Sequence, residues 1–299
     1  MAKSKSFFGL RRGSTKTLTF SVNDGKQITK DRVYEVKNPR TKAQMIQRMM
    51  LATSSAAYSA MKEIVDHSFE GITYGQPNMS EFSRLNTKKL KEQYAEVNPD
   101  FCYNKYQNRQ LLPGKYIMAR GTASLIKSDG FVFSGKTDAA GSLDIKVAAD
   151  VAAANLTANA VLSALGIGVG DMATFLIGYP LADESGLGFC FIRLKSLQSG
   201  TTAMTVSTIA DYFAVESNVP VQAGLGEHGL VLEAQPADAA TSESCMYCVV
   251  HSLKTANGWL RSNATMQLDS DMVLPWDAAD ALETYPIGGT YVLNGGNIE

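Results

Sequence analysis

One stretch, residues 38–69, constrains the fold more than any other, because it carries a clear helical pattern over many turns. Apolar and small residues recur in it at every third or fourth position, which places them on one face of a helix. Asn38 is a suitable N-cap residue and Pro39 fits a first turn. The small residues at 52–60 predict a close contact with another helix or another subunit. The predicted buried face consists of Ile46, Met49, Met50, Thr53, Ala57, Ala60, Met61, Ile64 and Val65.

A β-hairpin is predicted immediately before this helix. Polar and apolar residues alternate from Thr15 to Val22, as they do in a half-buried strand. The Asp24-Gly25 pair then supplies the positive φ that a tight hairpin turn needs, and residues 27–36 form the returning strand. An isolated two-stranded ribbon is marginally stable in water, so we expect the hairpin to pack on another surface.

The rest of the chain is mainly β in pattern. A second helix is expected from Ser80 onward, and a short helix at 155–165. Asn257-Gly258 indicates a hairpin turn, and short strands joined by Gly and Asn turns favour a sandwich or a barrel. The predicted strands are 116–124, 130–134, 143–147, 172–179, 188–194, 204–207, 229–233, 245–253 and 259–267. The predicted class is therefore α+β, with a hairpin and helical module at 1–115 and a mainly antiparallel β-sandwich-like domain at 116–299.

Positive charge is concentrated toward the start of the chain. Residues 1–120 hold 21 Lys and Arg against 10 Asp and Glu, a balance of +11, whereas residues 121–299 have a balance of −12. Such asymmetry predicts contact with a polyanion, or contact between the two ends of neighbouring copies in an assembly. The cations predicted to bind a partner subunit or a nucleic acid are Arg11, Arg12, Lys16, Lys26, Lys30, Arg32, Lys37, Arg40, Lys42 and Arg48.

Motifs for catalysis, cofactors or metals give little support to an enzyme. Cys245 and Cys248 have the spacing of a zinc knuckle, but no second ligand pair accompanies them, so we expect buried strand cysteines and no metal. Residues 166–170 are glycine-rich but precede a strand, which is the reverse of a dinucleotide-binding context, so we expect no cofactor. The alternative enzyme hypothesis is a sugar-processing site on an acidic segment near Trp276. Its candidate carboxylates are Asp269, Asp271, Asp277 and Asp280.

Composition narrows the cellular setting. Four cysteines in 299 residues are too few for a disulfide scaffold, which favours a reducing compartment. The N-terminal segment lacks an apolar stretch of signal-peptide length. The most apolar window, 160–182, is interrupted by Asp171, Pro180 and glycines, so no membrane span is expected. Synthesis in a cytoplasm is the expectation.

The segment 37–50 carries a family resemblance. An Asn-Pro-Arg-Thr-x-Ala-Gln helix start at 38–44, followed by Arg48 and preceded by a Gly25-containing basic hairpin, resembles a family of uncharacterised proteins from gut Bacteroidota and their phages. Residues 170–178 and the Asn257-Gly258-Trp259 turn are also similar to that family. The family has no assigned activity. The resemblance implies a phage or prophage setting, with synthesis in the bacterial host cytoplasm and location in the virion.

These observations lead to two functional hypotheses. The first is a phage virion structural or assembly protein that self-associates through its basic N-terminal module, with itself and other virion proteins as partners. Head-to-tail contacts between unlike surfaces would produce rings or filaments. The second is a nucleic-acid-binding protein that uses the basic segment 1–50.

Overall fold

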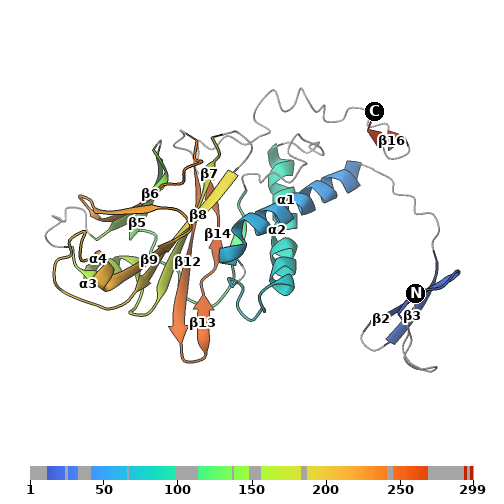
Figure 1. Cartoon of the computed structure of the whole chain (residues 1–299), viewed down its shortest axis with the longest axis horizontal. Coiled ribbons are helices and arrows are strands. Elements are labelled where there is room, and N and C mark those ends of the chain that lie inside the picture. Colours follow the sequence, from blue (N-terminus) through green and yellow to red (C-terminus); the bar gives the residue numbers. More distant parts are fainter. Residues whose placement is uncertain are drawn as a thin grey trace. The chain divides into compact units, whose positions relative to one another are not determined.

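The computed structural model describes most of the chain, which divides into two compact units (Figure 1). One unit comprises residues 1–41 and 291–299, and the other comprises residues 42–290. The described residues are 12–23, 26–32, 42–65, 67–97, 114–136, 138–147, 156–182, 187–240, 245–268, 293–294 and 297–298. Within this part, the architecture is mixed α+β, with an N-terminal hairpin, then helices, then mostly antiparallel sheets, as predicted.

The first unit contains the predicted hairpin. Strand β2 (Leu18–Asn23) pairs antiparallel with β3 (Lys26–Asp31), and β1 (Gly13–Ser14) adds a third strand on the other edge of β2. Asn23 pairs with Lys26, so the predicted turn residues Asp24 and Gly25 occupy the connection but lie outside the described residues. The same unit includes a second small pair, β16 (Leu293–Asn294) with β17 (Asn297–Ile298).

The strand β2 begins later than the alternation predicts. The backbone N–H of Thr15 donates to the carbonyl of Leu18 at 2.7 Å, and the N–H of Leu18 donates to Thr15 Oγ1 at 3.1 Å. These two bonds close a turn between β1 and β2. The threonine side chain therefore competes with the sheet for the backbone donors, which is its usual effect at strand ends.

Two helices open the second unit. Helix α1 (Lys42–Val65) packs on α2 (Gln76–Val97), with the rings of Tyr58 and Phe82 at 5.6 Å between centroids. The predicted buried face of α1 is confirmed at Met50, Thr53, Ala57, Met61, Ile64 and Val65. Ala60 is exposed, so its assignment to that face is wrong, and the predicted caps at 38 and 39 lie outside the described residues. Helix α2 begins before the predicted Ser80, after a turn at Gly75 with φ of 83°.

Two antiparallel sheets follow, and they share one core. The first sheet has the order β10 (Val221–Leu225), β11 (Gly229–Ala234), β6 (Ala139–Lys146), β5 (Phe131–Lys136). The second has the order β13 (Gly258–Arg261), β12 (Met246–Thr255), β7 (Met172–Pro180), β8 (Leu187–Ser196), β9 (Phe213–Ser217), and β15 (Gln267–Leu268) also pairs with β12. Short pairs and helices complete the unit: β4 (Ile117–Ala119) with β14 (Ala264–Thr265), α3 (Ala158–Leu165) and α4 (Ile209–Tyr212).

The second sheet is covered on both faces. Ile145 and Leu232 of the first sheet share a core with Phe175 and Ile192 of the second, and with α3. On the opposite face, Leu176 joins a second core that contains residues of α1 and α2. The unit therefore has three layers, namely a four-stranded sheet, the larger sheet and a helical layer (Figure 1). The division into two domains near residue 115 stays a prediction. The helices before that position and the larger sheet after it share one core.

Most predicted strands are present, but one is wrong, and β9 and β10 were both missed. The segment 204–207 is not a strand, because Thr205 N–H donates to Thr208 Oγ1 at 2.8 Å in a turn that leads into α4. Strand β10 was missed although its residues alternate, because Ala223 and Gly224 are residue types that are depleted in strands. The Asn257-Gly258 hairpin is confirmed, with Thr255 paired to Gly258.

Candidate functional site

The described cations of the predicted binding segment lie on an exposed strand. Lys26 and Lys30 are exposed on β3, and Arg32 follows directly, with its backbone N–H donating to the carbonyl of Thr17 at 2.7 Å. Arg12 and Lys16 are exposed in the same unit. Register pairs Lys30 with Thr19, and side chains directly opposite each other share a face of the sheet. Lys26 and Lys30 therefore share a face with polar residues of β2.

The remaining predicted cations are not brought into this group. Lys42 and Arg48 belong to α1 in the second unit, and their side chains lie outside the described part. Arg11, Lys37 and Arg40 lie outside the described residues altogether. The predicted continuous basic strip is thus described at the hairpin, and its continuation to the helix stays a prediction.

The opposite face of the hairpin is apolar along β2 only. Leu18, Phe20 and Val22 are half-buried on this face. Their partners on β3 are polar and exposed, namely Asp31, Thr29 and Gln27. A hairpin alone cannot bury a row of apolar residues. The hairpin therefore has one face that carries cations and one face with an apolar row suited to packing.

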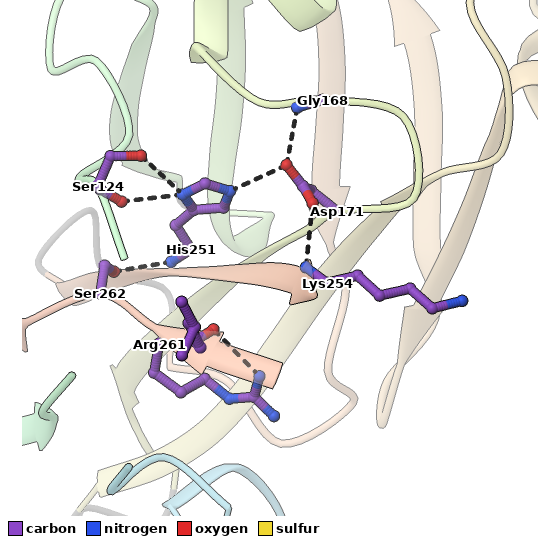
Figure 2. A network of polar contacts seen from close by, with 8 residues as sticks. Ser124, Gly168, Asp171, His251, Lys254, Arg261 and Ser262 are labelled. Carbon is purple, nitrogen blue, oxygen red and sulfur yellow. Dashed lines mark hydrogen bonds and ion pairs between the residues drawn. The ribbon is translucent and has the colours of Figure 1, made fainter. Parts of the chain in front are cut away.

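The second unit contains a buried polar network that no motif indicated (Figure 2). His251 on β12 is 2% exposed, and its Nδ1 lies 2.8 Å from the carbonyl oxygen of Ser124. A carbonyl oxygen only accepts hydrogen bonds, so we infer that Nδ1 carries a proton and donates it there. Nε2 faces Oδ2 of Asp171 at 3.4 Å. The backbone N–H of His251 donates to Ser262 Oγ at 2.9 Å.

Asp171 holds two backbone segments together in this network. Its Oδ2 accepts from the N–H of Gly168 at 2.9 Å, and its Oδ1 accepts from the N–H of Lys254 at 3.2 Å (Figure 2). The first bond closes the turn before β7, and the second fixes the end of β12. Asp171 as a whole residue is 5% exposed.

The network contains Ser, His and Asp but lacks the geometry of a nucleophile and its base. Ser124 Oγ is 3.5 Å from Nδ1 of His251, the nitrogen that the Ser124 carbonyl already engages at 2.8 Å. A general base needs a free nitrogen within about 2.6–3.2 Å of the hydroxyl that it activates. The imidazole and the carboxylate are both buried, so they serve here to connect strands. The 80 residues between Asp171 and His251 explain why sequence patterns gave no signal for the pair.

The prediction of buried cysteines is confirmed. Cys248 is buried in β12, Cys245 is buried directly before that strand, and Cys190 is buried in β8. Burial raises the pKa of Cys190 and of Cys248 to about 12. Cys190 belongs to the core between the sheets, and Cys248 belongs to the core beneath the helices. Among the described residues, no group of three or more His, Cys, Asp or Glu side chains is placed to hold a metal ion.

Two further expectations concern regions or properties outside these sites. The acidic segment with Asp269, Asp271, Asp277 and Asp280 lies outside the described residues. In the described part of the chain, none of the helices combines the length and apolarity needed to cross a membrane.

Comparison with known proteins gives no relative from which a role can be transferred. No protein-family model, no curated protein and no solved structure matches the chain. The functional argument therefore rests on the residues and their arrangement.

Proposed function

We propose that this chain is an assembly protein whose N-terminal hairpin unit binds a neighbouring copy. The observation that supports this most directly is the two-faced hairpin, with Lys26 and Lys30 on one face and Leu18, Phe20 and Val22 on the other. A small unit of this kind gains stability when its apolar face packs on a partner surface. Its cations then add electrostatic selection for an acidic partner.

The second unit carries exposed carboxylates that could take part in such a contact. Several carboxylates of its sheets, turns and α4 are exposed, and the chain from residue 121 onward has a balance of −12. Contact between the basic hairpin of one copy and the acidic body of the next is a heterologous contact, which continues into rings or filaments. The exposed carboxylates are those of Asp129, Asp138, Asp211, Glu216, Glu227 and Asp238.

A phage virion is the proposed setting for this assembly. The support is the resemblance of segment 37–50 to proteins of gut Bacteroidota and their phages. Capsid, portal or tail genes next to the gene for this chain would support the virion role. Metabolic genes next to the gene for this chain would count against a phage virion. The assembly proposal would not be affected, because experiments on the purified protein test it.

Light scattering on the full-length protein tests the assembly proposal. We expect oligomers at low salt that dissociate at about 1 M salt, where the Debye length is about 3 Å. Replacing Lys26 and Lys30 by Glu should abolish the oligomers. Replacing Lys62 and Lys146 by Glu, two exposed lysines of the second unit, makes the same charge change and should leave them intact. A monomer at all salt concentrations, or equal loss in both variants, would contradict the proposal.

Nucleic-acid binding is the second candidate, and the spacing of the cations favours it. Lys30 and Arg32 are two residues apart in an extended segment, which is about 7 Å. DNA carries one phosphate per about 3.4 Å of axis on each strand, and its major groove admits a two-stranded β-ribbon. If the hairpin binds DNA, the logarithm of the association constant should fall with the logarithm of the salt concentration. Lys30→Ala should make that slope less steep by about 1. Fluorescence anisotropy with labelled duplex measures that slope, and absence of binding at low salt would remove this candidate.

A further inference from the structure

A small polar pocket lies at the junction of the helical layer and the larger sheet. It has a volume of about 200 Å³. On the side of the helical layer it is lined by residues at and just after the end of α1, including Glu63 and His67. From the sheet it is lined by Thr174 of β7, Arg193 of β8, Ser252 of β12 and Arg261 of β13. The same face of the sheet is apolar farther along, at Leu176 and Cys248, so the polar residues are confined to this end.

Strand register brings the two arginines to one face. Thr174 pairs with Arg193 across β7 and β8, and Thr174 also pairs with Val250 of β12. Ser252, two residues after Val250, pairs with Arg261 of β13. Because paired residues share a face and alternate residues along a strand share a face, all of these side chains are on the helix side of the sheet. This placement follows from the sheet and does not depend on the conformation of one loop.

Both guanidinium groups are held in place by partners on neighbouring residues. Arg193 pairs with Glu216 at 3.0 Å and lies over the ring of Phe191. Arg261 donates from Nε to the carbonyl oxygen of His67 at 3.2 Å and lies over the ring of Trp259. Burial, and then the positive charge of Arg193, lower the pKa of Arg261, whereas Glu70 opposes that shift. The two cations are therefore close enough to repel each other in a partly desolvated place.

The pocket is also lined by two hydroxyl side chains. Thr174 is 5% exposed and Ser252 is 4% exposed, and both line the pocket. A hydroxyl group can donate one hydrogen bond, so two hydroxyls beside two guanidinium groups form a set of donors that suits an acceptor such as an oxyanion. The carboxylate of Glu63 is exposed, so it is well solvated and opposes an anion weakly.

We propose that this pocket binds a small oxyanion, a phosphate or carboxylate group held between Arg193 and Arg261, with Thr174 and Ser252 donating hydrogen bonds. Guanidinium groups bind both kinds of oxyanion through paired, charge-assisted hydrogen bonds. Bound water occupies about 30 Å³ per molecule, so about 200 Å³ admits a small anion with a few waters. Drug-sized ligands occupy sites of about 300–1,000 Å³, which restricts this pocket to small molecules or a single terminal group.

Isothermal titration calorimetry on the full-length protein tests the site. Inorganic phosphate and succinate are titrated separately at equal ionic strength, with chloride as the reference anion. Arg193→Gln should weaken binding by about tenfold or more, since it removes a charged hydrogen-bond donor. Thr174→Val keeps the shape of the side chain and should weaken binding by about fivefold without loss of the folded state. A preference for phosphate or for succinate identifies the class of oxyanion.

Two matched variants make the outcome specific. Arg84→Gln removes an exposed arginine that is also paired with a carboxylate, that of Glu81, and should leave binding unchanged. Lys26→Glu with Lys30→Glu separates this site from the basic hairpin, and should also leave binding unchanged. Absence of heat with both anions, or binding that survives both Arg193→Gln and Thr174→Val, would overturn the proposal. If Arg193→Gln unfolds, as circular dichroism would show, the Thr174→Val result decides.

Discussion

At the scale of single residues, Asp171 shows how one buried side chain connects segments that are distant in the sequence. Its carboxylate accepts two backbone N–H groups and faces His251, and it is almost fully buried. A buried carboxylate is costly unless donors surround it, and here the donors come from a turn and from a strand far along the chain. Removing it would take the acceptor from the backbone N–H groups of Gly168 and Lys254, which connect the turn to the end of β12.

Replacement of Asp171 by Ala should therefore destabilise the protein strongly. We expect a loss of roughly 2 kcal/mol in the free energy of unfolding, since a hydrogen bond to a charged group contributes about 1.5–3 kcal/mol. Urea denaturation followed by circular dichroism measures this loss.

Asp129→Ala, at an exposed position, is the control, and we expect a change of less than about 0.5 kcal/mol. If the two variants were equally stable, the network of Figure 2 would not contribute as described.

At the scale of secondary-structure elements, α1 shows how small residues define a close contact. Ala57 and Ser54 are completely buried in the middle of the helix, between larger residues such as Tyr58 and Met61. Small side chains allow the helix to approach its neighbours, which include α2 and the larger sheet. Packing at protein-interior density leaves no room for a larger side chain there.

Ala57→Leu should thus destabilise the protein by overpacking, by about 1–3 kcal/mol. Ala60→Leu is a matched control in the same helix, because it adds the same atoms at an exposed position. Leucine is almost as good a helix former as alanine, so the control should change stability by less than about 0.5 kcal/mol. Thermal unfolding of both variants makes the comparison, and equal loss in both would show that α1 is not packed as described.

Elements defined by local chemistry were the predictable part of the fold. The hairpin of β2 and β3 and the hairpin at Asn257-Gly258 follow from turn residues that need positive φ or tolerate it. The buried face of α1 follows from periodicity, and Ala60 failed because alanine is compatible with either face. The segment 204–207 failed because the Thr208 hydroxyl bonds to the backbone N–H and the carbonyl of Thr205, which a strand would use.

Contacts between distant strands were not predictable in the same way. Asp171 and His251 meet because β7 pairs with β12, and Arg193 and Arg261 line one pocket because β8, β7, β12 and β13 are adjacent. Strand order is set by the total packing of the sheets, and no local pattern encodes it. The basic hairpin was predictable because its charge is visible in composition, whereas the oxyanion pocket required the sheet order.

At the scale of the whole molecule, the chain divides into two compact units with different expected roles. The second unit contains the described cores, and the first contains the hairpin that we propose binds a neighbouring copy. The two cores described for the second unit contain no residue from the first 41. Its apolar contacts should therefore persist without the hairpin unit. The proposed assembly, in contrast, depends on the hairpin.

Deletion of residues 1–41 should consequently leave a folded protein that no longer oligomerises. We expect its free energy of unfolding to change by less than about 1 kcal/mol, a small part of the stability of a typical domain. Urea denaturation and light scattering on the same sample measure both properties. A deletion variant that unfolds would show that the first 41 residues contribute to the cores, and one that still oligomerises would place the contact elsewhere.

The positions of the buried thiols have a consequence for the way in which the protein opens. Thiolates are the reactive form of cysteine, and the raised pKa of Cys190 and of Cys248 keeps both protonated at neutral pH. The first thiol lies between the sheets and the second lies beneath the helices. Alkylation of Cys190 thus reports separation of the sheets, and alkylation of Cys248 reports detachment of the helical layer. Comparing the two labelling rates by peptide mass spectrometry would show which layer leaves first, so the chain carries its own pair of reporters for local unfolding.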